Sequence, residues 1–178
     1  MNDPGARDAG EAGDTRDTRQ PGHARAAGED VVLWRAFRPA MASHRRVLVV
    51  DDYREAADAL QMLLDADGFE CRAVTDPLSV CDIAANWQPF AVVLDIAMPG
   101  LDGLELARRL RAHPETGHML LIAFSAFASS EDRFRARAAG FDVHCAKPLT
   151  PGLLLRVLEC ATAPPGDGNG MQEGVPAP

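Results

Sequence analysis

The hydrophobic pattern of this chain divides the stretch from residue 46 to residue 162 into two alternating kinds of segment. The first kind is a short run of apolar residues that is closed by polar or turn-forming residues. Runs of this kind predict strands that are buried on both faces, as in a parallel sheet. Five such strands are predicted, at residues 47–50, 69–74, 90–94, 119–124 and 141–146.

The second kind of segment has apolar residues at helical spacing, and one follows each predicted strand. The predicted helices span residues 53–66, 76–87, 104–112, 129–139 and 150–161. Gly68 and Gly140 stand where helix-ending glycines are expected, and Asp76 with Pro77 forms a typical helix start. Strands that alternate with helices predict right-handed βαβ units. The expected fold is therefore α/β, a three-layer α/β/α sandwich around a five-stranded parallel sheet.

Three regions of different composition organise the chain. Residues 1–45 form an N-terminal extension rich in Gly, Ala, Asp, Arg and Pro, which is expected to be disordered or only partly ordered. Within it, residues 31–34 and Phe37 form an apolar island that is expected to dock on the folded domain or on a partner; alternatively, the natural chain starts at Met41. Residues 46–162 form the folded domain, which is long enough for one well-packed core. Residues 163–178 form a Gly- and Pro-rich tail that is expected to be disordered.

Composition narrows the classes of function. The chain has a formal net charge of -8, and residues 46–162 carry seventeen acidic and eleven basic side chains, which argues against direct DNA binding. No apolar run approaches the ~20 residues that span a membrane, and the polar N-terminus does not resemble a signal peptide. The four cysteines are widely spaced without metal-ligand spacing, so they are predicted to be reduced thiols. These features predict a cytoplasmic protein with no membrane contact.

Polar side chains follow four of the predicted strands. The first strand ends at Asp51 and Asp52, the third at Asp95, the fourth at Ser125 and the fifth at Lys147. Because the carboxyl ends of parallel strands share one edge of the sheet, where ligands of open α/β sheets bind, these groups are expected to converge. Three carboxylates within ~5 Å repel by about 3 kcal/mol per pair, so a cation between them is expected. Hard oxygen ligands suit Mg²⁺, and Mn²⁺ is an alternative.

This combination of groups suits phosphoryl transfer. Asp95 stands between an apolar run and a Pro-Gly turn, charged and open to the crevice, so we expect it to be the reactive nucleophile. The metal ion would bridge one phosphoryl oxygen, Lys147 would pair with a second, and Ser125 would donate to a third. Lys147 is the only lysine in the chain, and a compact ammonium at this place fits a point-charge role.

At these residues the chain resembles the receiver domain of two-component response regulators. The resemblance extends from about Arg46 to Ala161, about two-thirds of the chain, and concerns neither tail. It implies a flavodoxin-like (βα)5 receiver fold of the stand-alone type. The resemblance is carried by four motifs in order, each at the end of a predicted strand: Val49-Val50-Asp51-Asp52, Leu94-Asp95 with Met98-Pro99-Gly100-Leu101-Asp102-Gly103, Ser125-Ala126 and Lys147-Pro148.

The resemblance also implies roles for individual residues. Asp95 would accept a phosphoryl group from a phosphohistidine on a sensor histidine kinase or a histidine phosphotransfer protein. Asp51, Asp52 and Asp95, with the backbone carbonyl of Ala97, would hold the metal ion, Asp51 through water. These residues together would form the phosphoacceptor and metal site.

Further positions match residues that control the switch and its lifetime in such domains. Ser125 would move toward the phosphoryl group, and His144 stands where the family has a switch aromatic residue, often Tyr or Phe. The second residues after the phosphoacceptor and after the hydroxyl, here Ala97 and Phe127, shape the kinetics. Ala97 offers no side chain to orient an attacking water, and Phe127 would obstruct its approach. A long-lived phosphoryl group is therefore expected.

The expected activity is that of a phosphorylation-activated response regulator, which is not an enzyme apart from self-phosphorylation and autodephosphorylation. No output domain is expected after residue 162, so output would pass through another protein, with this chain either a relay intermediate that passes the phosphoryl group to a second histidine or an allosteric binder. The alternative is a pseudo-receiver, a protein-binding module that never uses Asp95. Haloacid dehalogenase-type phosphohydrolases need a second Asp where Ala97 stands, and a dinucleotide-binding fold needs a Gly-rich turn where Asp51 and Asp52 stand.

Each site residue also has a plainer structural interpretation. Asp95 would cap the loop that follows it, and Asp51 and Asp52 would be a helix N-cap pair, with Asp52 capping alongside its metal binding. Ser125 would be an ordinary loop residue, and His144 would be a surface histidine. The expected convergence of these groups at one sheet edge favours the functional interpretation.

Overall fold

The structure, a computed structural model, describes residues 31–34, 45–126, 129–148 and 151–162. At its centre lies a six-stranded sheet in the order β1-β6-β5-β4-β2-β3. The predicted five-stranded parallel sheet forms most of it. The parallel strands are β2 (Arg46–Val50), β3 (Glu70–Val74), β4 (Ala91–Leu94), β5 (Leu120–Ser125) and β6 (Val143–Ala146).

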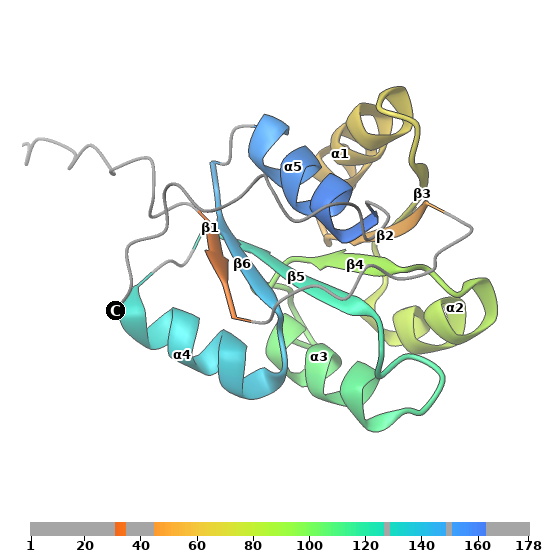
Figure 1. Cartoon of the computed structure of the whole chain (residues 1–178). Helices are drawn as coiled ribbons and strands as arrows, with labels where there is room; N and C mark the ends of the chain where they lie inside the picture. Colours follow the sequence, from red (N-terminus) through yellow and green to blue (C-terminus); the bar gives the residue numbers. More distant parts are fainter. Residues whose placement is uncertain (1–30, 35–44, 127–128, 149–150, 163–178) are drawn as a thin grey trace, which may run out of the picture.

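A sixth strand extends this sheet, so the predicted strand count was one too low. β1 (Val31–Leu33) lies antiparallel to β6 at the sheet edge, with Val32 opposite His144 (Figure 1). Residues 31–34 of the apolar island thus dock on the folded domain, whereas Phe37 lies outside the described residues. The three-residue length of β1 concealed it, because the two-residue period of a strand cannot be recognised in so short a run.

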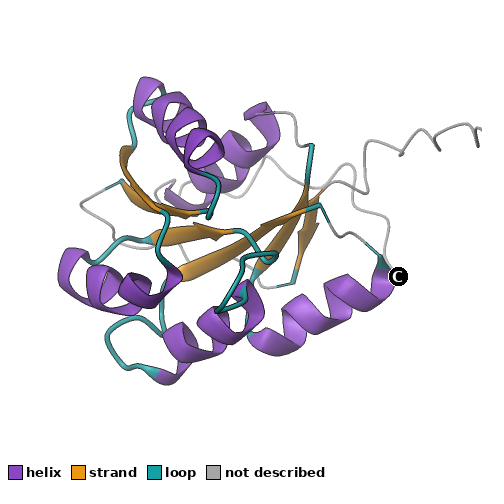
Figure 2. Cartoon of the chain, turned by 180° about the vertical axis from the view of Figure 1, so that it is seen from behind, coloured by secondary structure: helices purple, strands orange, loops and turns teal. Residues whose placement is uncertain are grey.

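Helices cover both faces of the sheet. α1 (Arg54–Ala66) and α5 (Pro151–Thr162) lie on one face, and α2 (Val80–Trp87), α3 (Gly103–Ala112) and α4 (Ser130–Ala139) lie on the other (Figures 1 and 2). One hydrophobic cluster joins the sheet to α2, α3 and α4, and a second joins it to α1 and α5. The predicted three-layer α/β/α sandwich is therefore confirmed.

Side-chain and glycine caps fix the ends of α3 and α4 within a residue of their predicted positions. The Asp102 carboxylate accepts a hydrogen bond from Glu105 N at 2.7 Å at the start of α3. Ser129 forms a capping box with Asp132 at the start of α4. Gly140 ends α4 with a φ of 103°, a left-handed conformation that glycine adopts at low cost.

The start of the second helical segment differs from the prediction. Asp76 accepts a hydrogen bond from Leu78 N at 3.0 Å, but Asp76 and Pro77 begin a 3₁₀ helix, η1 (Pro77–Ser79), rather than an α-helix. The α-helix α2 begins only at Val80. The helix-start residues therefore marked the position of the first turn but not its type, because such residues open both kinds of helix.

The central strands are buried because their sequences are continuously apolar. All residues of Val47–Val50 and Ala91–Leu94 are buried, as expected for strands covered on both faces. Cys71 and Cys145 are buried as well, and all four cysteines are free thiols, as predicted. Among the described residues, no helix combines the length and the apolar character that a membrane span requires.

Candidate functional site

The carboxyl ends of neighbouring parallel strands bring the predicted groups to one edge of the sheet. Asp51 and Asp52 follow β2, Asp95 follows β4, Ser125 is the last residue of β5, and Lys147 follows β6. The strand order places these four strands side by side. Carboxylate oxygens of the three aspartates lie within 4.8 Å of one another. The structure therefore gathers the acidic groups as the sequence predicts.

The Lys147 ammonium joins this acidic cluster. Its Nζ donates to Asp51 Oδ2 at 2.8 Å and to Asp95 Oδ2 at 3.1 Å, and it lies 5.0 Å from the ring centre of Phe124. Burial lowers the pKa of Lys147, but the hydrogen bonds and charges of Asp51 and Asp95 outweigh burial, so its pKa lies above the ordinary 10.5. The ammonium is therefore charged at neutral pH and offsets part of the repulsion among the carboxylates.

Backbone amides bind the other oxygens of two carboxylates. Asp51 Oδ1 accepts a hydrogen bond from Tyr53 N at 3.0 Å, and Asp95 Oδ1 accepts one from Ala97 N at 3.2 Å. Asp95 therefore bonds to its own loop, as its plainer interpretation requires, and also to Lys147. These contacts hold Oδ1 of each carboxylate, so that Oδ2 of each faces the Lys147 ammonium.

Asp52 does not cap the first helix, so that interpretation is wrong. The N-cap residue of α1 is Tyr53, which makes no side-chain capping bond. The Tyr53 amide instead donates to Asp51. Asp52 is exposed, whereas Asp51 and Asp95 are buried and half-buried, so its carboxylate is the one that faces solvent most openly.

The loop after Asp95 passes very close to the start of α3. Gly103 N donates to Ile96 O at 3.0 Å. A Cβ added at Gly103 would stand 2.2 Å from the backbone oxygen of Asp95 and 2.8 Å from Ile96 Cα. Glycine is therefore required here by the closeness of two backbones. This contact fixes the main chain that carries the candidate nucleophile.

The donor set at this edge fits a hard divalent cation. Three carboxylates and one ammonium leave a formal charge of two negative on the cluster, which one divalent ion would balance. Mg²⁺ prefers oxygen ligands and retains several waters, and the exposed Asp52 leaves room for them. Ala97, whose carbonyl is the remaining predicted ligand, is exposed in the loop after Asp95.

Ser125 and His144 are both fully buried. Ser125 belongs to β5 rather than to a loop, lies opposite Ala146, and its carbonyl accepts a hydrogen bond from Lys147 N at 2.8 Å. The ring centre of His144 lies 6.2 Å from that of Trp34. The surface interpretation of His144 is therefore wrong, because β1 covers the edge of β6 on which it lies.

Two contacts near the site were not predicted from the sequence, and one predicted residue lies outside the described part. Sequence reasoning did not find Phe124 beneath the Lys147 ammonium or Trp34 beside His144. The apolar island could have indicated that Trp34 packs on the domain. Phe124 lies in an apolar run whose pattern predicts only a buried strand. Phe127 lies outside the described residues, so its effect on water stays a prediction.

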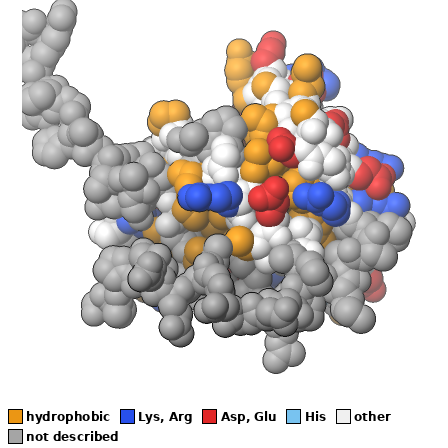
Figure 3. Space-filling model, turned by 45° about the horizontal axis from the view of Figure 1, so that its top comes forward, with side chains coloured by type: hydrophobic (Ala, Val, Ile, Leu, Met, Phe, Trp, Pro, Cys, Tyr) orange, Lys and Arg blue, Asp and Glu red, His pale blue; other side chains and the backbone are white. Residues whose placement is uncertain are grey.

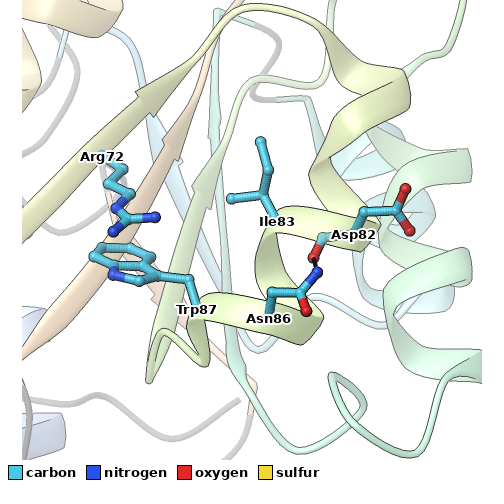
Figure 4. A pocket seen from close by; sticks show the side chains of 5 residues that line it. All are labelled: Arg72, Asp82, Ile83, Asn86 and Trp87. Carbon is cyan, nitrogen blue, oxygen red and sulfur yellow. Dashed lines mark hydrogen bonds between the residues drawn. The ribbon is translucent and has the colours of Figure 1, made fainter.

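A separate groove lies near the opposite end of the sheet. The Arg72 guanidinium lies 4.4 Å from the ring centre of Trp87, and Arg46, at the amino end of β2, donates to Trp87 O at 3.1 Å. The groove is thus distant from the carboxyl ends that carry the acidic cluster, and the cation–π contact between Arg72 and Trp87 forms part of its lining. It measures about 380 Å³ and is lined by Arg72, Asp82, Ile83, Asn86 and Trp87 (Figure 4).

Known protein sequences match the folded part of the chain. A family model described as the response regulator receiver domain matches residues 47–159. An uncharacterised 14.6 kDa protein of Leptolyngbya boryana is 33% identical over 121 residues, which cover 67% of this chain and 92% of that protein. Response regulator MprA of Mycobacterium sp. (strain KMS) is 39% identical over 104 residues, which cover 58% of this chain and 44% of MprA. The chain thus spans about half the length of the MprA relatives that it matches.

Solved structures agree with these matches. Chemotaxis protein CheY4 of Vibrio cholerae has a TM-score of 0.63 at 22% identity, over 66% of this chain and 98% of that chain, which shows a shared fold. The receiver domain of sensor histidine kinase PA1611 from Pseudomonas aeruginosa PAO1 has a TM-score of 0.61 at 26% identity, over 66% and 96%. That structure is described with a magnesium ion coordinated in the active site cleft. With its sheet order, its acidic cluster and these matches, the chain belongs to the response regulator receiver domain family of two-component systems.

Proposed function

We propose that this chain is a phosphorylation-activated response regulator that accepts a phosphoryl group on Asp95. The observation that carries the proposal is the Lys147 ammonium, which bonds both Asp51 and Asp95 beside a third carboxylate. A structural ion pair needs one carboxylate, whereas a phosphoacceptor site needs a nucleophile, metal ligands and a cation together. The family consists of signalling phosphoacceptor domains, and we propose no activity beyond self-phosphorylation and autodephosphorylation.

The donor would be a phosphohistidine on a sensor histidine kinase or a histidine phosphotransfer protein. A carboxylate oxygen of Asp95 attacks the phosphorus, the P–N bond breaks, and the imidazole nitrogen leaves with the electron pair. Asp95 then carries an acyl phosphate. Lys147 pairs with one phosphoryl oxygen, and Ser125 donates to another after it moves from its buried position. The Asp95 side chain is 12% exposed, so the donor reaches it through a narrow opening.

Asp51, Asp52, Asp95 and the backbone carbonyl of Ala97 would hold Mg²⁺, and Mn²⁺ fits the same oxygen ligands. Bound Mg²⁺ would offset the negative charge on the phosphoryl oxygens. Asp51 already accepts hydrogen bonds from Lys147 and from the Tyr53 amide, so we expect it to reach the ion through water. The exposed Asp52 is free of such contacts with the cluster lysine and is the better direct ligand.

Output would pass through contacts with a downstream protein. A phosphoryl group adds nearly two negative charges. Ser125 and His144 would move in response, and this movement would change the surface formed by α4 and α5. On the coloured part of the face in Figure 3, hydrophobic, acidic and basic side chains are interspersed, which suits a protein partner better than DNA. We place this receiver at residues 46–162, between the extension 1–45 and the tail 163–178, in the cytoplasm and without membrane or direct DNA contact.

The test is incubation of the full chain with acetyl phosphate and Mg²⁺, followed by intact mass and Phos-tag electrophoresis. Wild type is expected to gain one phosphoryl group, and Asp95→Asn or removal of Mg²⁺ should abolish the gain. Asp102→Asn is a matched control, because Asp102 lies in the same loop and Asn caps a helix as well as Asp does. It should be phosphorylated like wild type.

The alternative function, a phosphorylation-independent pseudo-receiver, predicts a different outcome. Neither acetyl phosphate nor any of a panel of phosphorylated kinases would then modify wild type. We further propose a long-lived phosphoryl group, because Ala97 offers no side chain to orient water. A wild-type half-life of seconds or less in the same assay would contradict this.

A further inference from the structure

The edge of β6 is the surface on which Val31–Trp34 docks. β1 pairs with β6 through Val31 opposite Cys145, Val32 opposite His144 and Leu33 opposite Val143. Trp34 N continues the pairing by donating to Asp142 O at 2.9 Å. Without β1, β6 would be an edge strand with unsatisfied backbone groups, which is the kind of edge that accepts an added strand. Figures 1 and 2 show β1 alongside β6 from both sides.

Side chains of this segment reach both faces of the sheet. Val31 packs against the hydrophobic cluster beneath α1 and α5, and Trp34 packs against the cluster beneath α2, α3 and α4. Leu33, by contrast, is 53% exposed. Trp34 is therefore the anchor of the segment on the face of α4, and Leu33 contributes little burial.

The anchor touches the predicted switch residue. The rings of Trp34 and His144 are 6.2 Å apart at an interplanar angle of 53°, within the range of favourable tilted aromatic contacts. His144 lies on β6, three residues before Lys147, which directly follows the strand and whose backbone N donates to Ser125 O. One short strand thus carries the docking edge along its side and the site lysine at its end.

The opposite end of β6 is held firmly. The backbone carbonyl of Asp142 accepts the hydrogen bond from Trp34 N. Its carboxylate forms an ion pair with Arg111 Nη2 and accepts a hydrogen bond from Leu121 N at 2.9 Å. Arg111 in turn donates to Gly140 O at 2.8 Å. Because Asp142 is anchored at the start of the strand, a displacement toward a phosphoryl group increases from Asp142 toward Lys147, and His144 lies between the two.

We propose that Val31–Trp34 is a tethered regulatory strand whose docking on β6 opposes phosphorylation of Asp95. The contacts of β1 fit the unphosphorylated arrangement of β6. When Lys147 and Ser125 move toward a phosphoryl oxygen, the end of β6 moves with them and the Trp34–His144 contact weakens. Trp34 is thus a positioning residue for the switch, and by linkage the phosphoryl group and β1 disfavour each other by the same factor. This inference assumes the proposed function of Asp95.

The experiment uses the full chain and beryllofluoride with saturating Mg²⁺, since beryllofluoride is an analogue of the phosphoryl group whose bound fraction is measured by ¹⁹F NMR. Trp34→Ala should bind it about fivefold or more tightly than wild type. Leu33→Ala, on the same strand but exposed, should stay within about twofold, below the range of allosteric couplings. Trp34→Phe, which keeps a ring beside His144, should resemble wild type.

A second measurement on wild type alone keeps the inference testable if Trp34→Ala fails to fold. Amide hydrogen exchange of peptides that cover β1 and β6 should quicken when beryllofluoride binds, while α2 peptides remain unchanged. Equal affinities of wild type and Trp34→Ala, or β1 exchange that does not respond to beryllofluoride, would overturn the regulatory strand and leave the phosphoacceptor proposal intact. Failure of both wild type and Leu33→Ala to bind beryllofluoride would overturn both proposals.

Discussion

Lys147 shows how the surroundings of one residue decide its chemistry. Its ammonium contacts two carboxylates, and although burial lowers its pKa, these contacts raise it above 10.5. A basic group with a raised pKa in the folded chain stabilises the fold below the unfolded pKa, and this contribution is lost only as the pH rises through the folded pKa. Lys147 therefore stabilises the fold fully at neutral pH while it also competes with any cation that binds Asp51 and Asp95.

This competition gives a prediction for Lys147→Gln. An ammonium and a doubly charged ion ~5 Å apart repel by about 1.7 kcal/mol in a water-like dielectric, so removal of the charge should tighten Mg²⁺ binding by about 10- to 20-fold. Phosphorylation by acetyl phosphate should nevertheless fall, because a phosphoryl oxygen loses its cation. Calorimetric Mg²⁺ titration measures the affinity. Arg109→Gln, which removes an exposed partner of Glu105, is the control and should change it less than twofold; unchanged or weaker binding by Lys147→Gln would contradict the competition.

At the scale of elements, strand ends and the turns that follow them position the site. The turn after β4 matters most, because the backbone oxygen of Asp95 lies against Gly103 at the start of α3. The capping bond from Glu105 N to Asp102 then fixes the direction of the helix. The loop that carries the candidate nucleophile is therefore held at both its ends.

Gly103→Ala is expected to disrupt this arrangement. The new Cβ would meet the Asp95 oxygen at 2.2 Å, and backbone cannot yield as a flexible side chain can, so the free energy of unfolding should fall by about 3 kcal/mol. Gly152→Ala is the matched control in α5, where a Cβ meets nothing within 4 Å and alanine should add about 0.5 kcal/mol. Urea unfolding measures both. Equal stabilities of the two variants would show that the turn relaxes freely.

The sequence predicted the elements whose signals are local and strong. Continuous apolar runs such as Val47–Val50 identified the parallel strands, and the polar residues that close them identified the edge where the acidic cluster lies. What it missed depends on contacts between distant segments. The ring of His144 packs beside Trp34, from more than a hundred residues earlier, and no local pattern contains that contact. The N-cap at Tyr53 rather than Asp52 was also not predicted: the Tyr53 amide donates to Asp51, whose other oxygen accepts from Lys147, 96 residues away in sequence.

At the scale of the whole molecule, the layer between the sheet and α1 and α5 encloses two thiols. Cys71 and Cys145 both belong to this hydrophobic cluster. Burial raises the pKa of both thiols to about 12, and the charge of Asp65 adds to the effect at Cys71. The folded chain therefore keeps two protons in alkaline solution that the unfolded chain releases.

The stability of the fold should consequently decline from about pH 9. Between the unfolded pKa of 9.0 and the folded pKa of about 12, the folded state binds one more proton per buried thiol, so the free energy of unfolding falls with rising pH. Each thiol contributes about 1.4 kcal/mol per pH unit. Cys145→Ala should reduce this slope in urea unfolding at pH 9, 10 and 11, whatever its effect on stability at pH 7. Cys160→Ala, half-buried in α5, is the control, and equal slopes for both variants would refute the assignment to Cys145.

The pairing of β1 with β6 also has a consequence for synthesis on the ribosome. Val31 emerges before any strand of the receiver sheet, yet its partner Cys145 belongs to the last strand to be made. β1 therefore has no strand to pair with while the rest of the sheet is translated. Since contacts between remote residues close the longest loops, β1 joins a domain that has otherwise finished folding. Pairing of β1 with β6 would therefore occur only after all the other strands of the sheet have been synthesised.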